Sequence, residues 1–294
     1  MTAPAADCQS LLREFEAIGD SPEIALMKLI IAAEDASFVE RMLLPASGSP
    51  YADRVVAVMR QNAAGCRRVA AMLASGVDTP PENGTIEEGI RFCRRLFDWS
   101  VAQSEEASVA LYSFGNPALL REATREIAEL FTTWGLLGPD KTALDIGCGI
   151  GRLEEALAPK LLHLTAIDVS EAMTAAARRR CVGISNVRVQ TASGLDLRDH
   201  ADGSFDLVFA VDSFPYLVQS GMPLVETHFA EAHRVLRGGG DFVILDFSYR
   251  EESRRDEEDV GRLAVAHDFE VLVAGSRPFS LWNGKAFRLR ARPS

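Results

Sequence analysis

Three alternating glycines follow an apolar run in the middle of the chain. The stretch LDIGCGIGR begins at Leu144 and places these glycines at Gly147, Gly149 and Gly151. Because glycine lacks a Cβ, such a loop can turn tightly and let its backbone touch a ligand. The same spacing also occurs in structural turns, so the loop alone does not define a function.

Two aspartates and one arginine narrow the choice of ligand. The dinucleotide fingerprint G-x-G-x-x-G needs glycine at position 152, but the residue is Arg152, which disfavours a pyrophosphate cradle. Asp145, just before the loop, would repel a phosphate and suits a cationic amino-acid ligand. Asp168 ends the next apolar run, where a carboxylate can accept hydrogen bonds from both ribose hydroxyls. Its alternative role is an N-cap of the following helix, although Ser170 could fill that role.

The segments that must position these residues alternate between strand-like and helix-like patterns. Seven strands are expected at 142–146, 164–169, 187–191, 205–211, 241–247, 269–275 and 285–291. Apolar runs without alternation are typical of strands covered on both faces. The pattern predicts an α/β fold with a doubly wound, seven-stranded, mostly parallel sheet. A short, turn-rich connection between the last two strands predicts an antiparallel edge hairpin.

The part of the chain before the sheet has a helical pattern. Apolar residues recur at spacings of three and four over 51–73, 86–101 and 116–134. Asn116 and Pro117 predict the start of the last of these helices. We therefore expect an all-α N-terminal region over 1–137, which caps the site or forms a dimer surface, and a second domain over 138–294.

Four segments, taken in order, resemble the signature of one enzyme family. They are LDIGCGIGRLEEALA, AIDVSEAM, GSFDLVFAVDSF and FAEAHRVLRGGGDFVILDF. Together they resemble class I S-adenosylmethionine-dependent methyltransferases over about residues 140–291. The resemblance implies that 138–294 is a methyltransferase domain with S-adenosyl-L-methionine as its cofactor. It implies methyl transfer to a small-molecule acceptor by in-line displacement.

The resemblance also assigns cofactor contacts. Gly147, Gly149 and Gly151 would line the methionine part, Asp145 would help to hold its ammonium group, and Asp168 would bind the ribose hydroxyls. The family usually has Gly-Asp after the third strand, where this chain has Thr191 and Ala192, so Ser193 or Asp196 is expected to replace that adenine contact. The other implied contacts are Val169 against adenine, Ala210 and Val211 under the methionine portion, and Tyr112 closing the methionine end.

Two residues after the fourth expected strand are the candidates for catalysis. Asp212 and Tyr216 follow this strand, and open sheets bind ligands at the carboxyl ends of their strands. Asp212 could act as a base, orient the acceptor, or cap the turn before Pro215. Tyr216 could contact the substrate or pack against neighbours. No cluster of His, Cys, Asp and Glu has metal-ligand spacing, so we expect no metal site.

The composition limits the partners. The chain of 294 residues has 31 basic and 42 acidic residues and a net charge of −11. Such a surface repels phosphate backbones and anionic lipid, so we expect neither a nucleic-acid nor a membrane partner. Five scattered cysteines suit reduced thiols. The first residues, MTAPAADCQS, lack a basic segment followed by an apolar run, so we expect no signal peptide and a cytoplasmic protein.

Two other functions stay open from the residues alone. A nicotinamide-dependent oxidoreductase could use the same type of sheet, although Arg152 and the edge hairpin weigh against it. A catalytically silent binding protein with a cofactor-type fold is the second alternative, and Ala192 at the adenine position supports it. The pattern does not identify the acceptor molecule or its reacting atom.

Overall fold

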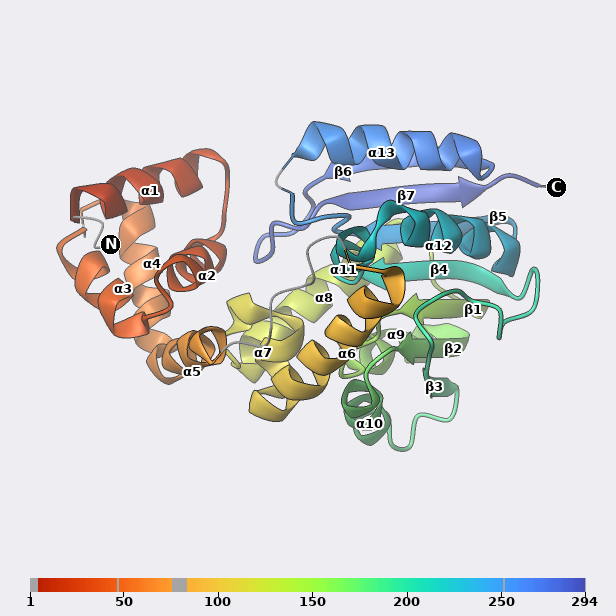
Figure 1. Cartoon of the computed structure of the whole chain (residues 1–294), viewed down its shortest axis with the longest axis horizontal. Coiled ribbons are helices and arrows are strands. Elements are labelled where there is room, and N and C mark those ends of the chain that lie inside the picture. The colour runs from red at the N-terminus through yellow and green to blue at the C-terminus, as the bar shows by residue number, and fades with distance from the viewer. Residues whose placement is uncertain (1–4, 47, 76–83, 251, 294) are drawn as a thin grey trace. The chain divides into compact units, whose positions relative to one another are not determined.

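The computed structural model describes residues 5–46, 48–75, 84–250 and 252–293 (Figure 1). These residues form two compact units. The helical unit comprises the described residues of Met1–Val77, Ser100–Ala123 and Phe279–Asn283, and the sheet unit comprises those of Asp78–Trp99, Thr124–Pro278 and Gly284–Ser294. Each unit is therefore built from several segments of the chain. The division into domains at residue 137 stays a prediction.

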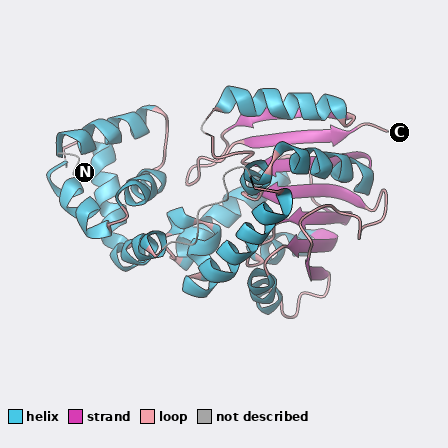
Figure 2. Cartoon of the chain, viewed as in Figure 1, coloured by secondary structure: helices cyan, strands magenta, loops and turns pink. Residues whose placement is uncertain are grey.

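The sheet unit contains seven strands, drawn in magenta in Figure 2. They are β1 (Gly138–Ile146), β2 (Leu161–Asp168), β3 (Val187–Thr191), β4 (Phe205–Val211), β5 (Leu236–Leu245), β6 (Phe269–Ser276) and β7 (Ala286–Ala291). Their order is β3-β2-β1-β4-β5-β7-β6, with β7 antiparallel to both β5 and β6 and all other pairs parallel. The predicted mostly parallel sheet with an antiparallel edge hairpin is confirmed.

Helices cover both faces of this sheet. Phe131 of α8 packs on Phe209 of β4 with ring centres 5.3 Å apart, and Phe229 of α12 packs on Phe242 of β5 at 5.4 Å. Phe209 is the register partner of Val243, so these two side chains lie on the same face of the sheet. Phe242 precedes Val243 in β5, so its side chain points to the other face. The sheet is therefore doubly wound. Its helical elements are α9 (Arg152–Leu157), η3 (Ala158–Lys160), α10 (Glu171–Arg180), α11 (Phe214–Ser220), α12 (Met222–Val235) and α13 (Ser253–Ala266).

Three strands begin earlier than the sequence pattern predicts. β2 starts at Leu161 instead of 164, and the two larger extensions are in β1 and β5. β1 starts at Gly138 instead of 142, and β5 starts at Leu236 instead of 241. The added residues of β1 and β5 are mostly exposed. The strand register also shifts next to them, in β1 between Gly138 and Thr142, and in β5 at the residues that pair with Phe205 and Leu207 of β4. Apolar patterning reports only the buried part of a strand, so it missed these extensions.

The helical unit is built around short, capped helices. Ser21, Ser49 and Ser104 accept backbone hydrogen bonds at the starts of α2, α4 and α7, as N-caps do. The elements that lie wholly in this unit are α1 (Ala5–Ala17), α2 (Pro22–Ala33), α3 (Ala36–Leu43), η1 (Leu44–Ala46), α4 (Pro50–Gln61), α5 (Ala63–Ala74), α7 (Glu105–Val109) and η2 (Leu111–Ser113). Two further helices, α6 (Ile86–Gln103) and α8 (Pro117–Thr133), contribute residues to both units.

The single helix expected over 51–73 is wrong, because the chain breaks at Asn62 between α4 and α5. The side-chain amide of Asn62 donates to the carbonyl of Val58 at 2.9 Å, and its oxygen accepts from the Asn116 amide at 2.8 Å. Asn116 also accepts from the N–H of Ala118 at 2.9 Å, so the expected helix start at Asn116 is confirmed. The apolar spacing continues across the break, which is why periodicity alone did not reveal it.

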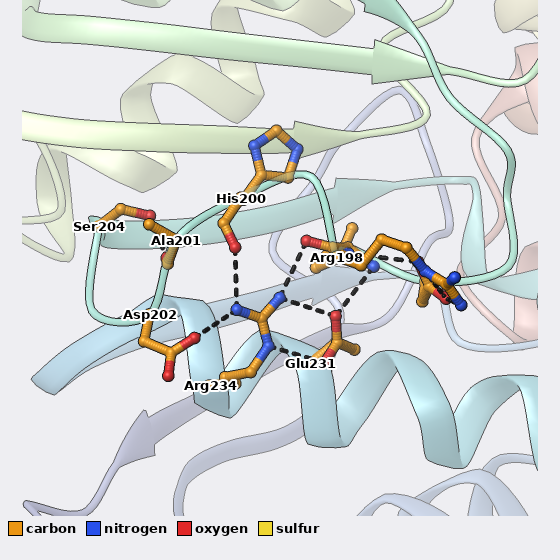
Figure 3. A network of polar contacts seen from close by, with 9 residues as sticks. Arg198, His200, Ala201, Asp202, Ser204, Glu231 and Arg234 are labelled. Atoms are coloured by element: carbon orange, nitrogen blue, oxygen red, sulfur yellow. Dashed lines mark hydrogen bonds and ion pairs between the residues drawn. The ribbon is translucent and has the colours of Figure 1, made fainter.

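A half-buried arginine fixes the loop between β3 and β4 (Figure 3). Arg234 of α12 donates to the backbone carbonyls of His200 and Leu197 at 2.8 and 2.9 Å. Its guanidinium also pairs with Glu231 and Asp202, and Glu231 accepts from the N–H of Leu197 at 3.2 Å. These bonds tie the loop to α12 and fix the start of β4.

Neither membrane spans nor clusters of metal ligands occur within the described ranges. No helix within them has the length and apolar character needed to cross a bilayer. Across the same ranges, no three His, Cys, Asp or Glu side chains are grouped as metal ligands. All five cysteines are buried free thiols.

Candidate active site

Four neighbouring strands carry an aspartate at or next to their carboxyl ends. In spatial order these are Asp168 of β2, Asp145 of β1, and Asp212 and Asp246, which directly follow β4 and β5. Burial raises the pKa of Asp145 well above its usual range, the pKa of Asp168 and Asp212 to about 6, and the pKa of Asp246 to about 8. Carboxyl groups with raised pKa values along one edge of a sheet are typical of a functional site and favour cationic ligands.

The glycine loop after β1 adopts a left-handed backbone at all three glycines. The φ angles are +86° at Gly147, +54° at Gly149 and +78° at Gly151. A Cβ at Gly147 would lie 2.5 Å from the Cβ of Ser213, and one at Gly151 would lie 2.9 Å from the Cα of Ala177. Packing within the protein therefore requires glycine at two of these positions, a reason that the sequence analysis did not consider.

Asp168 receives two backbone hydrogen bonds. The N–H groups of Gly149 and Ser170 donate to its two carboxylate oxygens, each at 2.9 Å. Ser170 fills the capping role at α10, because its hydroxyl accepts from the N–H of Met173 at 3.0 Å. Each oxygen of Asp168 keeps a lone pair for another donor. The arrangement fits a pair of ribose hydroxyls.

A second pair of acids lies beneath the glycine loop. Asp145 is 1% exposed and Glu154 of α9 is fully buried. Within the described residues, Oδ1 of Asp145 and both carboxylate oxygens of Glu154 have no hydrogen-bond partner. Burial raises the pKa of both groups, and the charge of Glu154 raises that of Asp145 further. An unpartnered buried oxygen at Asp145 fits the ammonium group of an amino-acid ligand.

The first part of α6 lies over the end of β2. Arg94 donates to the carbonyl of Val169 at 3.1 Å, and Asp98 accepts from the hydroxyl of Ser170 at 2.6 Å. A Cβ at Gly89 would lie 2.5 Å from the hydroxyl oxygen of Ser220 in α11. The sequence analysis assigned this helix to the N-terminal region, because its apolar spacing shows that one face is buried but not against what.

The adenine side has an apolar wall and little free polar surface. A Cβ at Gly194 would lie 2.6 Å from the side chain of Val169, so the loop after β3 passes close to the end of β2. Ser193 is exposed and accepts from the N–H of Leu195 at 3.2 Å. Asp196 is bound by Arg198, whose hydrogen bond lowers its pKa. Ser193 therefore remains the predicted replacement for the missing adenine contact.

The loops after β1 and β4 are joined directly. The hydroxyl of Ser213 donates to the carbonyl of Ile146 at 2.6 Å, beside the tight contact with Gly147. Ala210 is fully buried in the core and Val211 is 8% exposed, so only Val211 of this predicted pair presents surface to a ligand. Of the two predicted contacts under the methionine portion, only Val211 therefore has surface available.

The remaining predicted cofactor contact, Tyr112, lies in the helical unit. It belongs to the turn η2 and is 5% exposed. The neighbouring Phe114 is fully buried and packs closely on Gly65, where a Cβ would lie 2.0 Å from the Phe114 carbonyl oxygen. Tyr112 thus has a packing role in its own unit, and its role at the cofactor stays a prediction.

Asp212 and Asp246 lie side by side. The register of β4 and β5 pairs Val211 with Leu245, and the N–H of Asp212 donates to the carbonyl of Leu245 at 2.8 Å. Both aspartates have left-handed backbones, with φ of +57° and +66°. Such conformations are uncommon outside glycine and occur often at functional sites. The sequence analysis identified Asp212 and missed Asp246.

Aromatic side chains surround Asp212. The hydroxyl of Tyr249 donates to Oδ1 of Asp212 at 2.8 Å, and the rings of Tyr216 and Tyr249 are perpendicular with centres 5.7 Å apart. Phe97 of α6 contacts the other side of Tyr216 at 4.9 Å. Tyr216 therefore packs between two rings, and its predicted contact with substrate stays a prediction. Tyr249 and Phe97 are site residues that the sequence analysis missed.

Similarity to known proteins agrees with this architecture. Residues 144–244 match the family model described as a methyltransferase domain. The sarcosine/dimethylglycine N-methyltransferase of Halorhodospira halochloris is 29% identical over 145 residues, covering 48% of this chain and 50% of that protein. A demethylmenaquinone methyltransferase of Clavibacter sepedonicus is 33% identical over 154 residues, covering 52% and 57%. The chain thus spans about half the length of these relatives.

Solved structures share the fold. Phosphoethanolamine N-methyltransferase 1 of Haemonchus contortus, in complex with phosphoethanolamine and S-adenosylhomocysteine, aligns with a TM-score of 0.58 and 19% identity over 72% of this chain and 50% of that chain. The N-methyltransferase NodS of Bradyrhizobium japonicum, in complex with S-adenosylhomocysteine, aligns with a TM-score of 0.50 and 21% identity over 66% and 98%. Residues 144–244 thus resemble a methyltransferase domain, and the solved structures share the fold of this chain.

Proposed function

We propose that this protein transfers the methyl group of S-adenosylmethionine to a small-molecule acceptor. The observation that carries the proposal is the position of Asp168, which the backbone of Gly149 and Ser170 holds at the end of β2 beside the glycine loop. A carboxylate there suits a ribose, and its connection to Gly149 couples the ribose site to the loop that would hold the methionine part.

Each part of the cofactor has a group that fits it. Asp145 would hold the ammonium group, the glycine loop the methionine backbone, Asp168 the ribose, and Val169 with Ser193 the adenine. The bound cofactor supplies a methyl group on a sulfonium, which needs alignment with the acceptor more than it needs chemical activation. Asp212, close to the link between the β1 and β4 loops, would orient the acceptor.

The similar proteins support a small acceptor. Their names specify methylation of sarcosine and dimethylglycine, of phosphoethanolamine, and of demethylmenaquinone, all of which are small molecules. The net charge of −11 disfavours a nucleic acid as the acceptor. A homodimer formed through the helical region remains an expectation that sedimentation of the purified chain would test.

A second candidate function is a cofactor-fold protein with another activity or none. The [4+2]-cyclase SpnF aligns with a TM-score of 0.51 and 17% identity over 74% of this chain and 100% of that chain. This fold therefore supports other chemistry, and turnover must decide between the candidates. The nicotinamide-dependent oxidoreductase gains no support, because the matched domain is a methyltransferase domain.

Binding of S-adenosylhomocysteine by the Asp168→Ala variant tests the proposal. Loss of a charged hydrogen-bond partner is expected to weaken binding by about 1.5–3 kcal/mol, measured by calorimetry. The matched control is Asp140→Ala, which removes an exposed aspartate near the other end of the same sheet and should bind like the original protein. Equal affinity in the two variants would show that the ribose does not lie at Asp168.

Turnover separates an enzyme from a silent binding protein. The full chain is incubated with a methyl-labelled donor and a metabolite extract, and the compounds that gain the label are identified. Label in a small molecule supports the proposed function. Binding of S-adenosylhomocysteine without any labelled product would favour the silent protein.

A further inference from the structure

The loops after β4 and β5 form a corner that the cofactor contacts proposed above leave unused. We call the residues Phe97, Asp212, Tyr216, Asp246 and Tyr249 the acid–aromatic corner. The cofactor residues follow β1 and β2, and the strand order 3-2-1-4-5 reverses between β1 and β4, which neighbour each other in Figure 1. Ligands of open sheets lie across such a reversal. The corner is therefore on the acceptor side of the site.

The two carboxyl groups of the corner form no ion pair among the described residues. Asp212 and Asp246 are neighbours in register, and the hydrogen bond to the Asp212 side chain comes from the neutral hydroxyl of Tyr249. The charge of Arg152 lowers the pKa of Asp212, but its guanidinium donates to the hydroxyl of Thr124 at 3.1 Å. The charge of Lys285 lowers the pKa of Asp246, and the Lys285 carbonyl accepts from the N–H of Asp246. Its ammonium group, however, is bound to the buried Asp256 at 3.1 Å. No ion pair therefore neutralises the negative charge that the corner carries when its carboxyl groups are ionised.

The aromatic side chains of the corner suit the same kind of ligand. Tyr216 and Tyr249 meet at 90°, so the two rings form two walls next to the carboxylates. Tyr249 is 46% exposed and offers ring surface to a ligand. The faces of aromatic rings attract cations, and alkylated ammonium groups are recognised in this way. Carboxylates and ring faces together select for positive charge carried on an apolar group.

We propose that the acid–aromatic corner binds the acceptor through a positively charged amine group, and that the acceptor class is small alkylamines. This inference rests on the proposed methyltransferase function. A neutral or anionic acceptor would bring no positive charge to Asp212 and Asp246, so nothing would offset the free-energy cost of ionising these carboxyl groups away from water. The acidic surface of the chain would also attract a small cation.

Two probe molecules of nearly identical shape test the charge requirement. Choline carries a permanent positive charge, and 3,3-dimethylbutan-1-ol is its neutral carbon isostere. Binding of each probe to the full chain saturated with S-adenosylhomocysteine is measured by calorimetry or ligand-observed NMR. We expect choline to bind at least about tenfold more tightly than its isostere, a difference of about 1.4 kcal/mol.

Matched variants locate the site. Asp246→Asn should remove most of the preference for choline, whereas Glu270→Gln, the same charge change on the exposed edge strand β6, should keep it. Equal affinity for the two probes, or no binding of either, would overturn the inference. Binding of choline only to the chain without S-adenosylhomocysteine would also overturn it, because the corner would then hold part of the cofactor. Failure of the protein to bind S-adenosylhomocysteine would instead reject the proposed function and the inference with it.

Discussion

Acidic side chains have opposite environments at the two ends of the parallel strands, which we call the amino edge and the carboxyl edge of the sheet. At the amino edge, Asp206 is bound by Arg237 and Glu231 by Arg234. Arg234 lowers the pKa of Glu231, and at Asp206 the hydrogen bonds from Thr142 and Arg237 outweigh burial and lower the pKa. At the carboxyl edge, burial raises the pKa of Asp145, Asp168, Asp212 and Asp246, and none of them forms an ion pair within the described ranges.

This contrast separates acids that stabilise the fold from acids whose charge nothing in the fold stabilises. Paired acids at the amino edge contribute to folding, because their charged form is favoured in the native state. Acids with raised pKa values weaken the native state near neutral pH, and proteins keep them where function requires them. The carboxyl edge thus has the electrostatic character typical of a functional site, independently of any motif.

The largest expected effect is loss of stability at the amino edge. Arg234→Leu leaves two carbonyls and two carboxylates without their donor and should lower the free energy of unfolding by about 2 kcal/mol. The affinity for S-adenosylhomocysteine should stay within about twofold, because this network lies away from the proposed cofactor contacts. Urea denaturation and calorimetry measure the two quantities. As a control, Arg254→Leu removes an exposed ion pair and should leave the denaturation midpoint unchanged. Weaker binding with unchanged stability would reverse the roles assigned to the edges.

A smaller effect of opposite sign is expected beneath the glycine loop. The pKa of Glu154 is raised in the folded state, so folding favours its protonated form and stability falls as the pH rises above the usual glutamate range. Glu154→Gln removes this dependence and should be about 1 kcal/mol more stable than the original protein at pH 8, with the gain vanishing near pH 5.

Denaturation at the two pH values checks this prediction. Glu155→Gln is the matched control, since Glu155 is the next residue of the same helix but is exposed. A gain that is equal at pH 5 and pH 8 would mean that the charge of Glu154 does not destabilise the fold.

The smallest effect concerns the acid–aromatic corner. Because the pKa of Asp212 is about 6 and that of Asp246 about 8, raising the pH from 5.5 to 8.5 increases the negative charge that choline meets. The affinity of choline for the chain saturated with S-adenosylhomocysteine should rise several-fold, by less than about 1 kcal/mol. The increase is limited because the charge of Asp212, which ionises first, already provides part of the attraction.

The charged or titratable groups facing these two acids include Tyr216, Tyr249, Arg152, Lys285 and Asp256. Of these, the tyrosines have raised pKa values and stay neutral across this range. In Asp246→Asn the pH dependence should be confined to the range around pH 6. A flat profile in the original protein would show that the corner does not bind the cation.

The sheet could be predicted from sequence because its strands are buried on both faces. Runs such as FDLVFAV leave no alternating polar face, and β3 and β4 agree with the expected bounds residue for residue. Helix partners were not predictable in the same way. The pattern of α6 identified its apolar face, but only the fold brings Phe97 against Tyr216 and Asp98 against Ser170.

The site was predicted where a residue type coincided with a strand end. Asp168 and Asp212 were predicted because each follows an apolar run at the end of an expected strand. Asp246 follows such a run in the same way, but this pattern was not used. Glu154 could not have been found, because the sequence shows two adjacent glutamates in a helix and does not tell which one is buried. Its burial depends on how the first turn of α9 sits on the sheet.

The bond from Ser213 to Ile146 constrains how this protein can change its specificity. Under the proposed function this serine joins the loop on the methyl-donor side to the loop on the acceptor side, so mutations there would disturb both at once. Divergence toward new acceptors should therefore accumulate farther along, at Tyr216 and Tyr249, whose side chains can vary without moving the glycine loop. Directed evolution of this scaffold would do best to begin with those two tyrosines.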